Sequence, residues 1–115
     1  MPCVHEFGII DDFDNLKNYN EYDPKEFNCI SVEDDIINNL SEKLAIMKTY
    51  FHSFERPDFG LAYWGITLIP PESLSFFYSV VTSSIHYRKS VELNKLASEI
   101  NKATEEKKYM IHFGI

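Results

Sequence analysis

Apolar positions along the chain fall into two patterns, short continuous runs and longer periodic stripes. Four segments are largely apolar and predict strands: 4–10, 27–32, 59–69 and 109–115. The third run is the longest, and apolar residues on both of its faces are typical of a central strand that is covered on two sides. Gly8 within the first run indicates a bulge or the close approach of another segment of backbone.

Three stretches carry apolar residues at spacings of three and four, which predicts helices. The first stripe is the clearest and is continuous over Ile37, Leu40, Leu44, Met47, Phe51 and Phe54. Ser31 and Asp34 resemble a capping box before this helix, and Pro57 ends it because proline disfavours a helical residue before it. Glu33 and Asp35 are explained by the same helix start, where the helix dipole favours acids.

The second helix is predicted to begin at Pro71, because proline suits the first helical position. Its buried face is expected to comprise Leu74, Phe77, Tyr78, Val81 and Ile85. Ser90 is predicted to cap the third helix. The apolar stripe of the third helix comprises Leu93, Leu96, Ala97 and Ile100.

The elements follow the order strand, long polar segment, strand, helix, strand, helix, helix, strand. We therefore expect an α+β (mixed α/β) fold with a mixed sheet of about four strands and three helices packed on it. The 115 residues are expected to form a single domain, 1–115, in which residues 11–26 form an acidic loop. The sequence HEFGI at 5–9 echoes IHFGI at 111–115, which we attribute to chance, with both segments as strands beside the central one.

Charge is distributed unevenly along the chain. Residues 1–57 carry twelve acidic and five basic side chains, whereas residues 58–115 carry six of each, so the net charge of −7 belongs to the first half. A field of one sign repels nucleic acid and anionic membranes and attracts basic partners. Only Arg56 and Arg88 are available for bidentate phosphate contacts, so nucleic-acid binding is not expected.

Cys3 and Cys29 are too few for a disulfide scaffold and are expected to be two buried free thiols. The first ten residues lack the lysine or arginine of a signal peptide, and no apolar run reaches the ~20 residues of a membrane span. We therefore expect a cytoplasmic protein that makes no contact with a membrane.

Motifs for metals and cofactors do not fit the sequence. Residues 11–15 superficially resemble a calcium loop, but neither possible register places oxygen ligands and glycine at the required positions. The chain has four glycines and no glycine-rich phosphate loop. We expect no metal, no cofactor and no catalytic residues.

His5 and His112 fall on the two terminal strands, so they could be neighbours in space. A hydrogen-bonded structural pair is the preferred interpretation. Tyr63 and Trp64 form an aromatic block that is expected to pack in the core, although it could also floor a pocket. An alternative function therefore stays open, namely a small cytoplasmic enzyme or ligand-binding domain with a pocket near these four residues.

Two passages, GITLIPPESL at 65–74 and KKYMIHFGI at 107–115, resemble small bacterial immunity proteins that are encoded beside polymorphic or contact-dependent toxins. The resemblance implies a cytoplasmic inhibitor that binds and blocks a cognate toxin domain. It includes no motif with defined chemistry, so it assigns no functional residues.

The acidic, aromatic first half of the chain supports the same function, because an acidic surface can occupy the cationic cleft of a nuclease-type toxin. We therefore expect an immunity protein, not an enzyme, whose partner is a basic protein domain. Its contact surface is predicted to lie in the acidic loop, with the leading residues Asp11, Asp12, Asp14, Glu21, Tyr22, Asp23 and Glu26. The sequence leaves the oligomeric state open.

Overall fold

The computed structural model of the chain describes residues 3–13, 27 and 29–115. These residues form three helices and six strands, which confirms the α+β class and the number of helices. In chain order the elements are β1 Val4–Ile10, β2 Ile30–Glu33, α1 Asp34–Leu44, β3 Lys48–Phe51, β4 Pro57–Phe59, β5 Ile66–Ile69, α2 Pro71–Thr82, α3 Val91–Glu106 and β6 Tyr109–Phe113.

The strands form one sheet in the order β2-β1-β6-β5-β3-β4. Every pairing between these strands is antiparallel, so the expectation of a mixed sheet of about four strands is wrong in both respects. The first and last strands, β1 and β6, lie side by side in the middle of the sheet. The similar segments HEFGI and IHFGI are therefore neighbours in space as well as strands near the centre.

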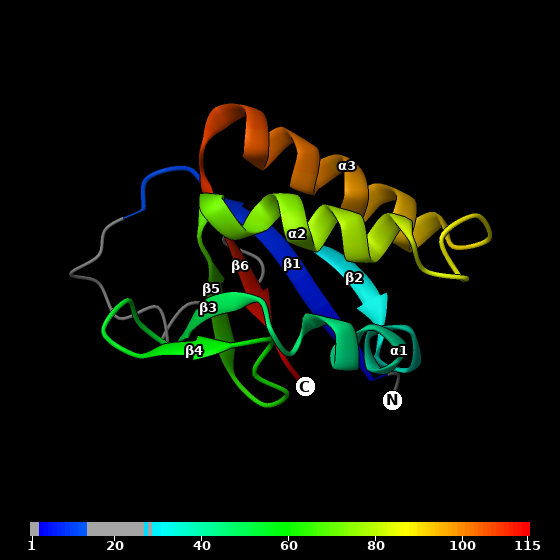
Figure 1. The fold of residues 1–115 in the computed structure, drawn as a ribbon, viewed down its shortest axis with the longest axis horizontal. Coiled ribbons are helices and arrows are strands. Elements are labelled where there is room, and N and C mark those ends of the chain that lie inside the picture. Colours follow the sequence, from blue (N-terminus) through cyan, green and yellow to red (C-terminus); the bar gives the residue numbers. More distant parts are fainter. Residues whose placement is uncertain (1–2, 14–26, 28) are drawn as a thin grey trace.

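All three helices pack on one face of the sheet (Figure 1). The larger core lies between them and the sheet, and it includes Phe7, Ile69 and Met110 from the strands. A smaller apolar cluster lies on the opposite face, where Leu68 and Ile111 are fully buried. The alternation of side chains along a strand explains this division, because neighbouring residues point to opposite faces.

The first predicted helix is too long. Helix α1 ends at Leu44; of the remaining stripe, Met47 lies in the turn before β3, Phe51 is in β3 and Phe54 is in the turn that follows it. Met47 and Thr49 are buried while Lys48 between them is exposed, which is the alternation of a strand. The predicted cap is also wrong, because Glu33 stands at the N-cap position and makes no capping bond with its side chain.

The predicted central strand 59–69 is divided in two. Its first residue belongs to the edge strand β4, and its last four residues form β5 in the interior of the sheet. Between them the backbone turns at Gly60 and Gly65, whose φ angles of 74° and 123° are costly for other residues. The apolar residues between these glycines therefore leave the sheet.

Other local predictions are confirmed at the helix starts. Pro71 opens α2, and the Ser90 hydroxyl accepts a hydrogen bond from the backbone N–H of Leu93 at the start of α3. The stripe of α3 is buried as predicted. On α2, however, Val80 is buried in place of Tyr78, and Ile85 lies beyond the helix and is exposed.

The two cysteines differ from the expected buried thiols. Cys3 is exposed and Cys29 is only partly buried, and no disulfide joins them. Cys29 lies close to Gly8, where an added Cβ would come within 2.9 Å of the Cys29 sulfur and of the Phe27 Cβ. The prediction that Gly8 marks a close approach of another segment is therefore confirmed.

Candidate functional site

A row of hydrogen-bonded polar side chains crosses the centre of the sheet on the face that carries the helices. His5 Nδ1 lies 2.8 Å from His112 Nε2, and His112 Nδ1 lies 3.1 Å from the Thr67 hydroxyl. At the other end, His5 Nε2 lies 2.8 Å from a carboxylate oxygen of Asp34. We call these four residues, Asp34, His5, His112 and Thr67, the histidine relay.

Strand register places three members of the relay on one face. Thr67 on β5 is directly opposite His112 on β6, and His112 is opposite Phe7 on β1. His5 precedes Phe7 by two residues, so its side chain points to the same face. Asp34 is the first residue of α1, and its backbone N–H donates to the Cys3 carbonyl. The relay therefore ties the start of α1 to three adjacent strands.

The hydrogen-bond network assigns the protons of the relay. The Asp34 carboxylate only accepts, so His5 donates to it through Nε2 and, as a neutral ring, accepts at Nδ1. His112 then donates from Nε2 and accepts the Thr67 hydroxyl at Nδ1. Thr67 in turn accepts the backbone N–H of Ala62 at 2.8 Å. In this arrangement each imidazole donates from one nitrogen and accepts at the other, and the hydrogen bonds run in a single direction from Thr67 to Asp34.

Burial supports the uncharged state of the inner ring. His5, His112 and Thr67 are fully buried. Burial, together with the neighbouring His5, holds the pKa of His112 well below its ordinary value of 6.5. Desolvation disfavours a charged imidazolium, so His112 is neutral at physiological pH.

Asp34 connects the relay to the surface. The hydrogen bond from His5 is the main cause that lowers the pKa of Asp34, and the bonds from Tyr63 and Asn38 act in the same direction. The Tyr63 hydroxyl donates to the second carboxylate oxygen of Asp34 at 2.9 Å, which raises the pKa of Tyr63. Asp34 is therefore an ionised carboxylate that holds Tyr63 in place.

The relay is poorly suited to acid–base catalysis. Both nitrogens of His5 and both nitrogens of His112 are engaged with groups of the protein. A general base needs a nitrogen within hydrogen-bond reach of the substrate. The relay therefore fits a structural role, as the sequence predicts for the histidine pair, and the prediction that His5 and His112 are neighbours is confirmed.

The segment that carries Tyr63 is fixed by the C-terminal end of the chain. The backbone N–H of Ile115 donates to the Tyr63 carbonyl at 2.9 Å, and that of Gly114 donates to the Gly65 carbonyl at 2.7 Å. A Cβ at Gly114 would collide with the carbonyls of Tyr63 and Ala62. Glycine is therefore required there because two backbone segments approach closely.

A pocket of about 320 Å³ opens between α1 and the segment that follows β4. We call it the α1 pocket. It is lined by His5, Ile37, Asn38, Ser41, Leu44, Ala45, Phe59, Gly60, Leu61 and Tyr63. The relay therefore forms part of its wall through His5, and Tyr63 links the pocket to the Asp34 carboxylate.

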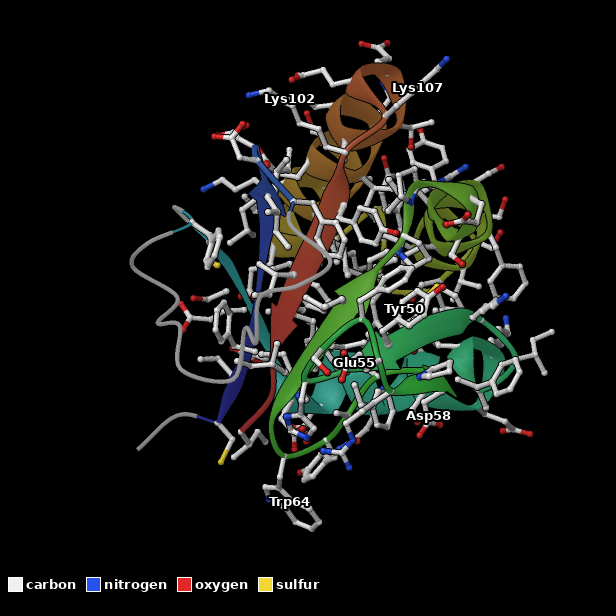
Figure 2. All side chains as sticks on the ribbon, turned by 90° about the vertical axis from the view of Figure 1, so that its left-hand side faces the viewer. Tyr50, Glu55, Asp58, Trp64, Lys102 and Lys107 are labelled. Atoms are coloured by element: carbon white, nitrogen blue, oxygen red, sulfur yellow. The ribbon has the colours of Figure 1, made fainter. Side chains whose placement is uncertain are left out.

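Large apolar side chains are exposed around this pocket. The exposed fractions are 60% for Phe59 and 37% for Tyr63, which line it. They are 74% for Ile46, which follows Ala45 of the lining, and 74% for Trp64, whose ring packs edge-on against Tyr63 at 4.8 Å. Figure 2 shows Trp64 projecting away from the body of the protein. We call these four residues the apolar rim.

The structure brings some of the sequence-predicted site residues together and places others apart. Tyr63 joins His5 and His112 through Asp34, but Trp64 is exposed, so its expected core packing is wrong. Among the predicted contact residues, Asp11 follows β1 at the end far from His5. Its carboxylate accepts a hydrogen bond of 2.8 Å from Lys108, so it does not belong to the apolar rim.

Asp12 is exposed beside Asp11. The remaining predicted contact residues lie outside the described residues: Asp14, Glu21, Tyr22, Asp23 and Glu26. Their role as contact residues stays a prediction.

Sequence reasoning missed the parts of the site that depend on sheet register. Thr67 carries no local signal, because only its position opposite His112 makes it part of the relay. Phe59 and Ile46 were hidden within a predicted strand and beside a predicted helical stripe. The pair Gly60 and Gly65 could have signalled that the residues between them leave the sheet.

The sequence matches no protein-family model, and no curated protein or solved structure is significantly similar to it. Among the described residues, no helix has the length and apolar character needed to span a membrane. No group of three or more His, Cys, Asp or Glu residues within the same part of the chain is arranged to hold a metal ion.

Proposed function

We propose that this protein is an inhibitor of the immunity type, which binds and neutralises a basic, nuclease-type toxin domain in the cytoplasm. The apolar rim and the carboxylates around it would form the contact surface. The observation that carries the proposal is that two exposed aromatic side chains, Phe59 and Tyr63, line one pocket, while Trp64 packs against Tyr63 and Ile46 follows the lining residue Ala45.

Exposed apolar groups of this kind support protein binding. Isolated surface leucines or valines need no explanation, but a cluster of large apolar side chains around a hollow marks an interaction site. Trp64 and Tyr63 belong to the residue types that contribute most to binding energy at interfaces. Tyr63 is also held by Asp34 and by the backbone bond from Ile115, so a partner would order it at little entropic cost.

The charge distribution supports a basic partner. Residues 33–64, which include α1 and the rim, carry six acidic and three basic side chains, whereas residues 65–115 carry five and six. Figure 2 shows Asp58 and Trp64 toward one end of the protein, and Lys102 and Lys107 at the other. This separation would orient an approaching cationic protein toward the rim and raise its association rate at low salt.

The alternative is a small enzyme or ligand-binding domain with a pocket near Tyr63, Trp64, His5 and His112. The α1 pocket supports binding of some kind, since His5 and Tyr63 line it. The engagement of all four ring nitrogens argues against the enzyme, and the exposure of Trp64 favours a large partner over a ligand enclosed in a pocket. We therefore place protein binding first.

The proposal is tested by co-purification and by neutralisation. The tagged protein would be isolated from the organism of origin, and basic proteins that co-purify would be identified and expressed alone. We expect at least one to arrest growth and to be neutralised by co-expression of the wild-type chain. Trp64→Ala should abolish this rescue, whereas Phe76→Ala, which removes a partly exposed aromatic ring on α2, should preserve it.

Two results would contradict the proposal. One is that no toxic partner is recovered, and the other is that Trp64→Ala rescues growth as well as wild type does. The acidic loop is tested separately by replacing Asp11, Asp12, Asp14 and Asp23 with serine. A weaker salt dependence of binding would support its predicted contact role, whereas unchanged affinity at two salt concentrations would remove it.

A further inference from the structure

The α1 pocket is lined by apolar side chains together with a few polar ones. Ile37 and Leu44 on α1 and Leu61 on the facing segment supply its apolar wall. Its volume of about 320 Å³ is near the lower limit of the roughly 300–1,000 Å³ of small-ligand pockets. A pocket of this size suits a single long side chain better than a whole cofactor.

The polar groups of the pocket are arranged to receive a donor. The Tyr63 hydroxyl and the Asn38 amide both donate hydrogen bonds to the Asp34 carboxylate, at 2.9 and 3.2 Å. The oxygen atoms of both side chains can still accept hydrogen bonds, although the Asn38 amide also interacts with the Tyr63 hydroxyl. Ser41 likewise donates its hydroxyl hydrogen to the Asn38 carbonyl at 2.8 Å and keeps its oxygen lone pairs. A group rich in N–H donors would be complementary to these three side chains.

The electrostatic environment favours a cation. None of the ten described residues that line the pocket is a lysine or an arginine. The Asp34 carboxylate does not line the pocket but accepts hydrogen bonds from the lining residues Tyr63 and Asn38, and its lowered pKa keeps it charged at physiological pH.

The exposed ring of Phe59 distinguishes between the two cationic side chains. Phe59 lines the pocket and is 60% exposed, and the Tyr63 ring is also accessible. A planar guanidinium stacks on aromatic rings and offers five N–H donors, whereas an ammonium is a compact and strongly hydrated charge. The methylene stem of arginine would pack against the apolar wall.

We propose that the α1 pocket binds an arginine side chain presented by the basic partner protein. Identification of the partner as the source rests on the proposed function, whereas the preference for a guanidinium rests on the pocket alone. Lysine, a neutral polar side chain and an apolar side chain are the competing occupants.

The preference can be tested without the partner. Wild-type protein labelled with ¹⁵N would be titrated with N-acetyl-argininamide, and backbone amide shifts would be followed by NMR. We expect shifts at Gly60, Leu61 and Tyr63. The neutral isostere N-acetyl-citrullinamide should bind at least about tenfold more weakly, because it removes the charge and keeps the shape. N-acetyl-lysinamide and N-acetyl-norleucinamide should also bind more weakly than the arginine compound.

Two variants locate the site. Phe59→Ala should weaken binding of N-acetyl-argininamide at least about threefold through loss of stacking. Tyr63→Phe, which removes only the hydroxyl, should weaken it by a similar factor. Phe76→Ala is the matched control, because Phe76 is a partly exposed phenylalanine that does not line the pocket, and it should leave binding unchanged.

The outcomes separate this inference from the proposed function. The pocket assignment is wrong if the arginine compound shifts no pocket amide, or if citrulline, lysine or norleucine amides bind as tightly. In that case a toxic partner that depends on Trp64 would still support the proposed function. If argininamide binds as expected but no toxic partner is found, the guanidinium site stands and the partner as its source is contradicted.

Discussion

His5 on β1 and His112 on β6 share a hydrogen bond of 2.8 Å between Nδ1 and Nε2, although 107 residues separate them in the chain. Both rings are buried, and the remaining nitrogens contact Asp34 and Thr67. The bond therefore belongs to a network that joins the first strand, the last strand, β5 and the start of α1. Through Tyr63, the same network supports the apolar rim.

Replacing His112 with leucine should destabilise the fold. The substitution keeps an apolar group in the core but leaves His5 Nδ1 and the Thr67 hydroxyl buried without their partner, which costs about 1–3 kcal/mol. The free energy of unfolding in urea measures the effect. His86→Leu, which changes a partly buried histidine outside the relay, is the control. Equal stability of His112→Leu and wild type would contradict a structural role for the relay.

Acid should weaken the protein through His112. The pKa of His112 is well below 6.5 in the folded state, so its contribution is fully present above that pH. As the pH falls below about 6.5, His112 becomes protonated in the unfolded chain but stays neutral in the folded chain. The free energy of unfolding therefore decreases by up to about 1.4 kcal/mol per pH unit.

Urea unfolding between about pH 7 and pH 5 measures this loss. The slope of stability against pH should be smaller in His112→Leu than in wild type. Identical slopes in the two proteins would show that His112 titrates normally in the folded state.

Replacing Asp34 with asparagine should move the pKa of Tyr63 back toward its ordinary value of 10.0. The hydrogen bond to the Asp34 carboxylate is the main cause that raises this pKa, and an amide carries no charge to oppose the tyrosinate. Tyrosinate absorbance across an alkaline titration reports the change, with Tyr63→Phe used to identify the Tyr63 contribution. Asp35→Asn, at the neighbouring exposed carboxylate, should leave the titration as in wild type.

Replacing Gly114 with alanine should displace the segment that carries Tyr63. The added methyl would collide with the Tyr63 and Ala62 carbonyls, and forcing an extra group into a packed site costs about 1–3 kcal/mol. Urea unfolding gives the stability, and Trp64 fluorescence reports the displacement. Ile115→Ala, at an exposed neighbouring side chain, should change both much less. An unchanged Trp64 signal in Gly114→Ala would argue against this anchoring.

The sequence predicts those parts of the fold that local chemistry determines. Pro71 and Ser90 mark helix starts because their preferences act within one turn, and the stripe of α3 is uninterrupted. The stripe around Met47 misleads because its spacing fits both a helix and the alternation of β3. Only the pairing of β3 with β4 and β5 decides between the two, and that pairing is a property of the whole sheet.

In the candidate site, too, local features could be predicted from the sequence, whereas features set by strand pairing could not. His5 and His112 can be expected to meet because they occupy the two terminal strands, but Thr67 joins them only through the register of β5 against β6. Trp64 is apolar and therefore suggests the core. It is exposed because Gly60 and Gly65 turn its segment out of the sheet, a geometric effect that hydrophobicity does not report.

The affinity of the purified partner for wild type and for Trp64→Ala, measured by calorimetric titration, tests the central claim most directly. If the apolar rim is the contact surface, Trp64→Ala should weaken binding at least about tenfold, equivalent to about 1.4 kcal/mol, while Phe76→Ala binds as wild type does. Equal affinities for wild type and Trp64→Ala would contradict the account and place the partner elsewhere on the protein.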